Sequence, residues 1–95
     1  MPVVVGVLTV DLRLPEAQTL KDKRQVLQSL LARLGTRFNV SAAETDHQDN
    51  PQRAQIAVAV VSNEGRACAE RLGSALRLVE AEARAEVIGA EQQLL

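Results

Sequence analysis

The residues of this sequence that could do chemistry are mostly charged side chains, and few belong to types that catalyse reactions. His47 is the only histidine and lies in a polar stretch, and Cys68 is the only cysteine. Nucleophilic catalysis needs a nucleophile, a base and a group that orients the base, and no such set stands out here. The sequence also has no phosphate-binding glycine loop. We therefore predict a protein that is not an enzyme and that takes no cofactor.

A second cluster of chemically capable residues could hold a metal ion. Glu44, Asp46, His47 and Asp49 lie close together in the sequence. Carboxylate and imidazole ligands suit a hard or borderline divalent cation. Scattered carboxylates outside a recognised calcium or zinc loop are weak evidence for such a site, so we predict no metal.

Basic residues concentrate in one segment. From Thr19 to Arg37, five basic residues stand against one acidic residue, a local charge of +4, whereas the whole chain carries −1. Such a patch can follow the phosphates of a nucleic acid. Sheets that read RNA by stacking need exposed aromatic rings, and this chain has no Trp or Tyr and a single Phe38, which we assign to the core. The contact that this patch predicts is electrostatic, with phosphate groups, and DNA is not expected as the partner. The residues expected to make it are Arg13, Lys21, Lys23, Arg24, Arg33 and Arg37.

Hydrophobic periodicity divides the chain into the elements that must position these residues. Alternating apolar residues predict strands over 3–14, 38–46, 55–62 and 84–92. Apolar residues at helical spacing predict two helices, one over 19–34 and one that ends near 83. Thr19 is expected to cap the first helix and Gly35 to end it, and Ser62 or Asn63 is expected to cap the second.

The order of these elements predicts the fold. A βαββαβ sequence in two similar halves matches the ferredoxin-like split βαβ pattern. Right-handed crossovers then place both helices on one face of an antiparallel sheet with strand order 4-1-3-2. We predict a single α+β domain over residues 1–95, with a core that contains Leu8, Val10, Leu27, Leu30, Val58, Val60, Leu72 and Val79.

Lys23 is unusual because it falls inside the leucine stripe of the first helix, where a charged side chain needs a partner. Glu44 is in phase with the apolar residues of the second strand, and we predict a structural ion pair between Lys23 and Glu44. The alternative is an anion site formed by Lys21, Lys23 and the first N–H groups of the helix, although Asp22 already occupies that helix end. For a structural pair, we expect Lys23→Met to be tolerated better than Glu44→Ala.

The sheet face away from the helices is expected to be apolar. Soluble monomers rarely expose a contiguous apolar patch, so we predict a two-fold homodimer. No apolar run is long enough to span a membrane, and the N-terminus lacks the basic region of a signal peptide, so we expect a cytoplasmic protein. The predicted dimer face consists of Val3, Val5, Val7, Ala57, Ala59 and Val61.

Three blocks of the sequence resemble a known family. The stretch TLKDKR at 19–24 resembles the Ser-Leu-Lys-x-Lys-Arg signature of YlxP-like bacterial proteins, and segments 37–46 and 52–62 are similar to two further blocks of that family. One departure is Pro51, which stands where the family often has a tryptophan. The resemblance implies a ferredoxin-like fold and supplies no catalytic residues.

The same resemblance implies a role linked to translation, because genes of this family often lie among genes for translation initiation and ribosome maturation. We therefore hypothesise a non-enzymatic protein that associates with the ribosome or its RNA. In that case, Lys21→Glu with Arg24→Glu should abolish the association. The alternative is a homodimeric module that binds a protein or a small ligand and makes no contact with RNA.

Overall fold

A computed structural model describes residues 2–95 and contains one four-stranded antiparallel sheet. Its strands are β1 (Val4–Arg13), β2 (Ser41–Asp46), β3 (Arg53–Ser62) and β4 (Glu86–Leu94). They lie in the order β2-β3-β1-β4, which is the predicted order read from the opposite edge. The ferredoxin-like βαββαβ fold class is therefore confirmed.

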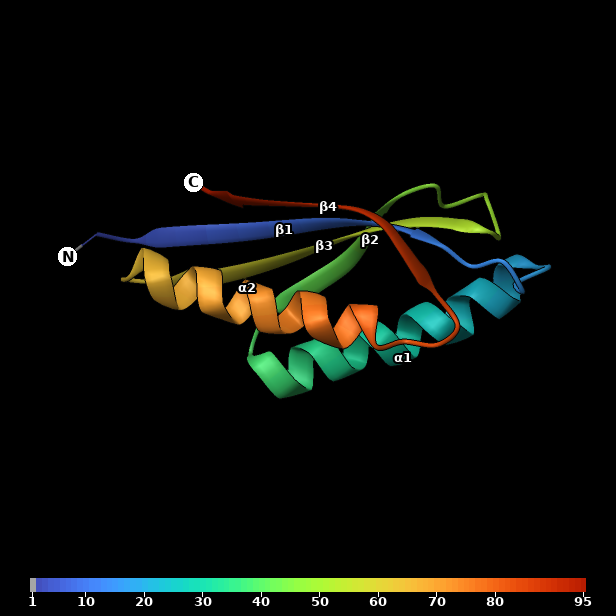
Figure 1. Ribbon diagram of the computed structural model, residues 1–95, viewed down its shortest axis with the longest axis horizontal. Coiled ribbons are helices and arrows are strands. Elements are labelled where there is room, and N and C mark those ends of the chain that lie inside the picture. Colours follow the sequence, from blue (N-terminus) through green and yellow to red (C-terminus); the bar gives the residue numbers. More distant parts are fainter. Residues whose placement is uncertain (1) are drawn as a thin grey trace.

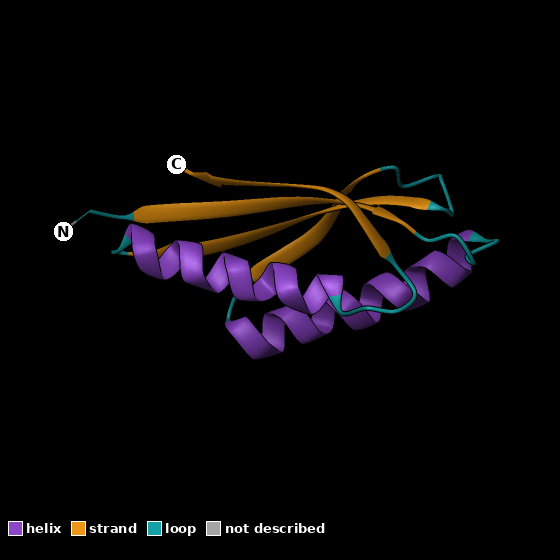
Figure 2. Ribbon diagram, viewed as in Figure 1, coloured by secondary structure: helices purple, strands orange, loops and turns teal. Residues whose placement is uncertain are grey.

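Two helices cover one side of this sheet. Helix α1 (Leu20–Phe38) follows β1, and helix α2 (Gly65–Glu80) follows β3. Both lie against the same face, and no element packs on the opposite face of the described chain (Figure 1). Figure 2 shows the same two layers, with the strands above and the helices below. No helix within residues 2–95 is long and apolar enough to cross a membrane.

The core lies between the sheet and the helix layer. Strands β1 and β3 pair along their whole length, from Val4 opposite Ser62 to Arg13 opposite Arg53, and form the centre of the sheet. All eight predicted core residues are buried: Leu8, Val10, Leu27, Leu30, Val58, Val60, Leu72 and Val79.

Gly6 allows α2 to approach the sheet closely. A Cβ atom at Gly6 would lie 2.9 Å from Leu72 Cδ1 and 3.2 Å from Cys68 Cβ. A side chain at this position would therefore require the end of Leu72 to move and Cys68 to shift by a few tenths of an ångström, and glycine avoids both. Cys68 is fully buried at this contact and acts as a small core side chain.

The end of α1 differs from the prediction. The helix does not stop at Gly35 but continues to Phe38, and Asn39 then ends it with a left-handed φ of 52°. An interior glycine costs about 1 kcal/mol relative to alanine, and the packing of Leu34 and Phe38 against the core opposes that cost. Phe38 therefore belongs to a helix and not to the second strand, which begins at Ser41.

Four other elements have boundaries that differ from the prediction by a few residues. Strand β1 is Val4–Arg13, and β3 begins at Arg53. Neither predicted residue caps α2. Glu64 holds the cap position and makes no side-chain capping bond, and the helix ends at Glu80. Strand β4 is Glu86–Leu94, because a tight turn with carboxylate contacts occupies the segment before it.

Candidate nucleic-acid interface

The start of α1 is capped by the side chains of Thr19 and Asp22. Thr19 Oγ1 accepts a hydrogen bond from Asp22 N (3.1 Å), and Asp22 Oδ2 accepts from Gln18 N (2.9 Å) and Thr19 N (3.2 Å). These backbone donors, Gln18 first, hold the pKa of the Asp22 carboxyl below its ordinary value. The predicted cap is therefore present. An external anion would have to displace Asp22 from the helix end.

Lys23 is buried, with 1% of its surface exposed. Its Nζ atom donates to the carbonyl oxygens of His47 (2.7 Å), Gln48 (3.3 Å) and Arg53 (3.2 Å). Nζ also lies 2.9 Å from Glu44 Oε2, which makes the predicted ion pair part of the structure. The three carbonyls accept from the three N–H bonds of the ammonium group. The contact with Glu44 is therefore an ion pair only, and Glu44 Oε2 accepts no hydrogen bond among the described residues.

This carbonyl cage, formed by the oxygens of His47, Gln48 and Arg53 around Lys23, bears on two expectations. Lys23 is not available to RNA, because its ammonium group is enclosed by protein acceptors. The structure also leads us to expect the opposite ranking of the two substitutions from the one that the sequence suggested. Lys23→Met leaves three partly buried carbonyls and a carboxylate without a donor, whereas Glu44→Ala leaves the ammonium group with three acceptors.

The cage also fixes the turn between β2 and β3. His47 adopts a left-handed φ of 63°, and its carbonyl makes the shortest bond to Lys23. Asp46 Oδ1 accepts from His47 N (2.7 Å), and Asn50 Oδ1 accepts from Gln52 N (2.9 Å). The side chains of Asp46 and Asn50 are thus engaged with the backbone of this turn. Across residues 2–95, no three His, Cys, Asp or Glu side chains converge as metal ligands would.

The other predicted RNA contacts are divided among different surfaces. Arg13 pairs with Glu86 (3.0 Å) at the C-terminal end of β1, and Arg33 of α1 pairs with Glu82 (2.7 Å). Lys21 and Arg24 are exposed near the start of α1, and Arg37 is exposed near its end. The six residues therefore do not form one patch.

Glu82 is the most strongly bound carboxylate in the described chain. It is 8% exposed and accepts from Arg84 Nε (2.8 Å), from Arg84 N (3.0 Å) and from Arg33 Nη2 (2.7 Å). The side chain and backbone of Arg84, followed by Arg33, lower the pKa of the Glu82 carboxyl to about 2. Glu82 therefore holds the turn before β4 against α1 through its contact with Arg33.

A basic groove crosses the outer surface of the helix layer. Three shallow hollows adjoin there: one over the end of α1 contains Arg33 and Arg37, and a second between the helices contains Arg37, Ser74 and Arg77. The third, on α2, shares Ser74 and Arg77 with the second and adds Arg66. Four arginines and a single carboxylate, Glu70, line what we call the helix-layer groove.

The centre of this groove holds its unpaired charges. Among residues 2–95, neither Arg37 nor Arg77 forms an ion pair, whereas Arg66 has an exposed pair with Glu70 and Arg33 is held by Glu82. Arg77 Nη2 donates to Ser74 Oγ (3.0 Å), and the Arg37 guanidinium lies 6.0 Å from the Phe38 ring centre. Phe38 packs against the core as expected, although from α1 and not from a strand, and it also lines this surface as the only aromatic ring of the chain.

Sequence reasoning missed Arg66, Ser74 and Arg77. These residues lie on the polar side of α2, where charged side chains are ordinary. The signal that they share is spatial, since the C-terminal halves of α1 and α2 lie side by side (Figure 1) and Arg37 and Arg77 line the same hollow.

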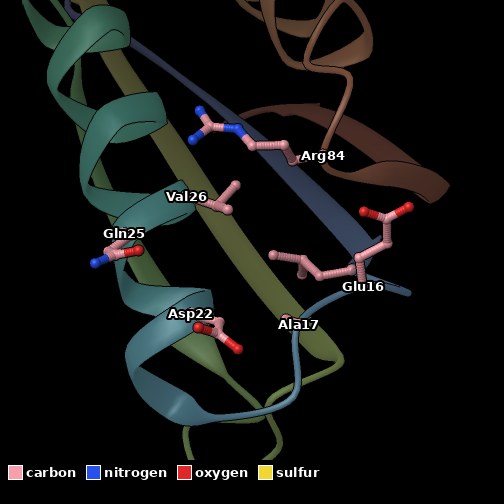
Figure 3. Close-up of a pocket in the computed structure, with 7 residues that line it drawn as sticks. Glu16, Ala17, Asp22, Gln25, Val26 and Arg84 are labelled. Atoms are coloured by element: carbon pink, nitrogen blue, oxygen red, sulfur yellow. The ribbon is translucent and has the colours of Figure 1, made fainter.

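A separate cavity of about 210 Å³ lies beside the start of α1. Figure 3 shows Asp22 and Val26 of α1 on one side of it, with Glu16 and Arg84 opposite. Asp22 is already bound by the helix cap, and Arg84 by Glu82. Only Glu16 and Gln25 remain as polar side chains without a partner there, which is a poor set for a small ligand.

The structure is a ferredoxin-like domain with four arginines along hollows of its helix layer. The chain matches the family model described as protein of unknown function (DUF503) over residues 5–92. It belongs to this family, as the three sequence blocks had indicated.

A curated relative supports the same membership. The chain is 37% identical over 60 residues to the "Uncharacterized protein YlxP" of Bacillus subtilis (strain 168). That alignment covers 63% of this chain and 65% of the relative, so it spans just under two thirds of each.

Solved structures with the same arrangement show the fold alone, because their sequences are too different. The designed protein Foldit4 superposes with a TM-score of 0.58 at 13% identity and covers 99% of this chain and 97% of its own. A C-terminal segment of the alpha subunit of aIF2 from Pyrococcus abyssi superposes with a TM-score of 0.50 at 18% identity. It covers 100% of this chain and 51% of its own.

Proposed function

We propose that this protein is a non-enzymatic cytoplasmic protein that binds ribosomal RNA through the helix-layer groove. The observation that carries the proposal is the pair Arg37 and Arg77, two arginines that line one hollow between the helices and have no carboxylate partners in the described chain. Guanidinium groups bind phosphate oxygens with two parallel hydrogen bonds, so an adjacent pair suits an RNA backbone. The link to translation implied by the family resemblance supports ribosomal RNA as the source of those phosphates.

The surrounding residues favour a phosphate chain over a single small anion. The groove continues from Arg33 across Arg37 and Arg77 to Arg66, and Glu70 is its only acidic lining residue. An extended polyanion can contact several of these arginines, whereas a single phosphate ion cannot reach both Arg66 and Arg77, which lie about 16 Å apart along the axis of α2. Arg66 is available because its pair with Glu70 is exposed, and exposed pairs of this type contribute only about 0.3–0.5 kcal/mol.

A simpler account of the two arginines also exists. Both lie in the last turn of their helices, where a positive charge stabilises the helix dipole. That role requires no ligand and predicts that substitution lowers stability slightly and leaves RNA binding unchanged. The experiment must therefore measure binding and stability on the same variants.

The test is binding of the purified protein to ribosomal RNA over a salt series. Two to four phosphate contacts predict a slope of log K against log salt of roughly −1.5 to −3.5. Arg37→Gln with Arg77→Gln should weaken binding roughly 10–100-fold and reduce the slope by about 2. The matched control is Lys21→Gln with Arg24→Gln, which removes the same charge from the other end of α1 and should weaken binding much less.

Three results would contradict the proposal. They are absence of binding at low salt, binding that does not depend on salt, and equal losses in the two double variants. Equal losses in the two double variants would indicate that the RNA interface includes the start of α1, as the sequence alone had suggested.

The second candidate function is a homodimeric module that binds a protein or small ligand without RNA. The cavity beside Asp22 gives it little support, because the charged groups there are already paired. The uncovered sheet face supports the homodimer itself, which is compatible with RNA binding.

A further inference from the structure

We propose that the helix-layer groove binds a double-stranded segment of RNA, whose sugar–phosphate backbone lies directly against α2 at Gly73. This inference rests on the proposed function, because it names the form of RNA that the same groove takes. It adds a contact that the arginines do not provide, which is a bare stretch of helix that lets the RNA backbone come close.

Gly73 lies in the interior of α2, and nothing in the described chain requires a glycine there. No glycine among residues 2–95 has a positive φ. Apart from adjacent residues and the backbone of its own helix, a Cβ atom at Gly73 would have one neighbour within 4 Å, Arg77 Nη1 at 3.7 Å, which is an ordinary van der Waals distance. Neither α1 nor the sheet would therefore collide with an alanine at this position.

Gly6 has the internal reason that Gly73 lacks. A Cβ atom at Gly6 would lie 2.9 Å from Leu72 Cδ1, so the packing of α2 on the sheet explains that glycine. An interior glycine destabilises a helix relative to alanine, and at Gly73 no contact within residues 2–95 offsets that loss. A glycine also allows a ligand to approach the backbone closely, and this is the use that remains for Gly73.

The residues around Gly73 identify the group that approaches as an anionic backbone. Arg66 and Arg77 are about three turns apart and lie on the same side of α2, with Gly73 between them. Ala69 and Ser74 line the same hollow, so its floor is low between the two guanidinium groups. A sugar–phosphate backbone that crosses this floor can place a phosphate at each arginine.

Glu70 is the one carboxylate on this side of α2. Its Oε1 atom lies 3.1 Å from Arg66 Nε, in a pair whose side chains are 83% and 69% exposed. Exposed pairs of this kind are weak, so a phosphate can replace Glu70 at Arg66. Removal of the carboxylate by Glu70→Gln should therefore strengthen RNA binding.

The lack of stacking side chains favours a duplex over a single strand. Proteins that bind single strands combine a basic groove with aromatic rings on which the bases stack. The only aromatic ring of this chain, Phe38, packs against the core. Double-stranded RNA is recognised mostly by its shape and through backbone contacts, which arginines and a bare helix surface can supply. A duplex also holds its phosphates in place, whereas a flexible strand must be ordered on binding.

The first experiment compares an RNA duplex with each of its two separate strands at the same salt concentration. The duplex should bind roughly tenfold more tightly than either strand. Equal affinities, or tighter binding of a single strand, would overturn the duplex assignment and leave the RNA proposal in place. Absence of binding to all three RNAs at low salt would contradict the proposed function itself.

The second experiment tests the contact at Gly73, with Gly35 as the matched control. Gly35 is also an interior, partly exposed helix glycine, and a Cβ atom there would contact only Val40 O at 3.7 Å, away from the groove. Both Gly73→Ala and Gly35→Ala should raise the melting temperature by a few degrees, because alanine favours the helix. Only the first should lower duplex affinity, by about threefold, and Gly73→Leu should lower it by about tenfold.

A protein that becomes more stable and yet binds RNA less tightly is the expected signature of a contact residue. Unchanged affinity in both Gly73 variants would overturn the contact at Gly73, and so would an equal loss of affinity in Gly35→Ala. If Gly73→Leu fails to fold by circular dichroism, Gly73→Ala still gives the answer, because the structure accommodates a methyl group there.

Discussion

The two ends of helix α1 carry similar charge but differ in how that charge is used. At its start, Asp22 caps the helix and Lys23 is enclosed by carbonyls and Glu44. At its end, Arg37 lies beside Arg77 without a carboxylate in reach among the described residues. At the start, Asp22 and Lys23 therefore serve the fold, while Lys21 and Arg24 stay exposed without ion pairs among residues 2–95. What distinguishes the end is that two arginines without carboxylate partners line one hollow.

The comparison shows why charge density is a poor guide to a binding surface. The sequence concentrates basic residues near the start of α1, and that region is the more conspicuous of the two. Burial and pairing decide availability, since a buried and paired charge cannot be offered to a ligand without a large desolvation cost. A binding surface is better recognised by charges that the protein leaves unpaired.

The largest expected effect comes from breaking the carbonyl cage. Lys23→Met should lower the free energy of unfolding by roughly 3–5 kcal/mol, because it leaves buried acceptors without a donor. Glu44→Ala should cost less, about 1–2 kcal/mol, because the ammonium group keeps three carbonyl partners. Urea unfolding of the two variants measures the difference. A smaller loss for Lys23→Met than for Glu44→Ala would show that the cage is not what stabilises this end.

The second-largest effect is expected at Glu82, where one substitution should change both the stability of the fold and RNA binding. Because its pKa is lowered to about 2 in the folded chain, from an ordinary 4.5, the carboxylate stabilises the fold fully above about pH 5. That stability is lost as the pH falls toward 2. Glu82→Gln should cost roughly 2–3 kcal/mol at neutral pH and flatten the loss of stability between pH 5 and pH 2.

The same variant also tests whether Arg33 belongs to the RNA-binding surface. Glu82→Gln releases Arg33 from a carboxylate, so RNA binding of the folded protein should rise a few-fold. Measurement of melting against pH and of RNA affinity on one preparation gives both results. Unchanged affinity would mean that Arg33 lies outside the interface.

The smallest effect is expected at the helix cap. Thr19→Ala removes the hydroxyl that accepts from Asp22 N and should cost about 1 kcal/mol. RNA affinity should not change, because the cap lies at the end of α1 that serves the fold. A clear loss of affinity in this variant, at temperatures where it stays folded, would weaken the division between the two ends.

Much of the fold could be predicted from residue pattern. Alternation in β1 and β3 and the leucine stripe of α1 indicate which side chains are buried, and their phases also pair Lys23 with Glu44. The end of α1 was harder to place. Phe38 continues the helical spacing from Leu34 and equally begins the alternation toward Val40, so pattern alone does not separate helix from strand.

The site could be predicted only in part, for two physical reasons. The acceptors around Lys23 are backbone carbonyls, which every residue carries, so no residue type marks them. The groove depends on α1 and α2 lying side by side, which brings Arg37 to Arg77 across 40 positions of sequence. Neither arginine is unusual until the other is placed beside it.

An NMR titration with a ribosomal RNA fragment tests the central claim most directly. The amide signals of Phe38, Ser74 and Arg77 should shift, together with the side-chain Nε–H signals of Arg37 and Arg77. The signals of Thr19, Lys23 and the turn around Gln48 should stay in place. Shifts confined to the start of α1 and that turn, with the Arg37 and Arg77 signals unmoved, would contradict the account.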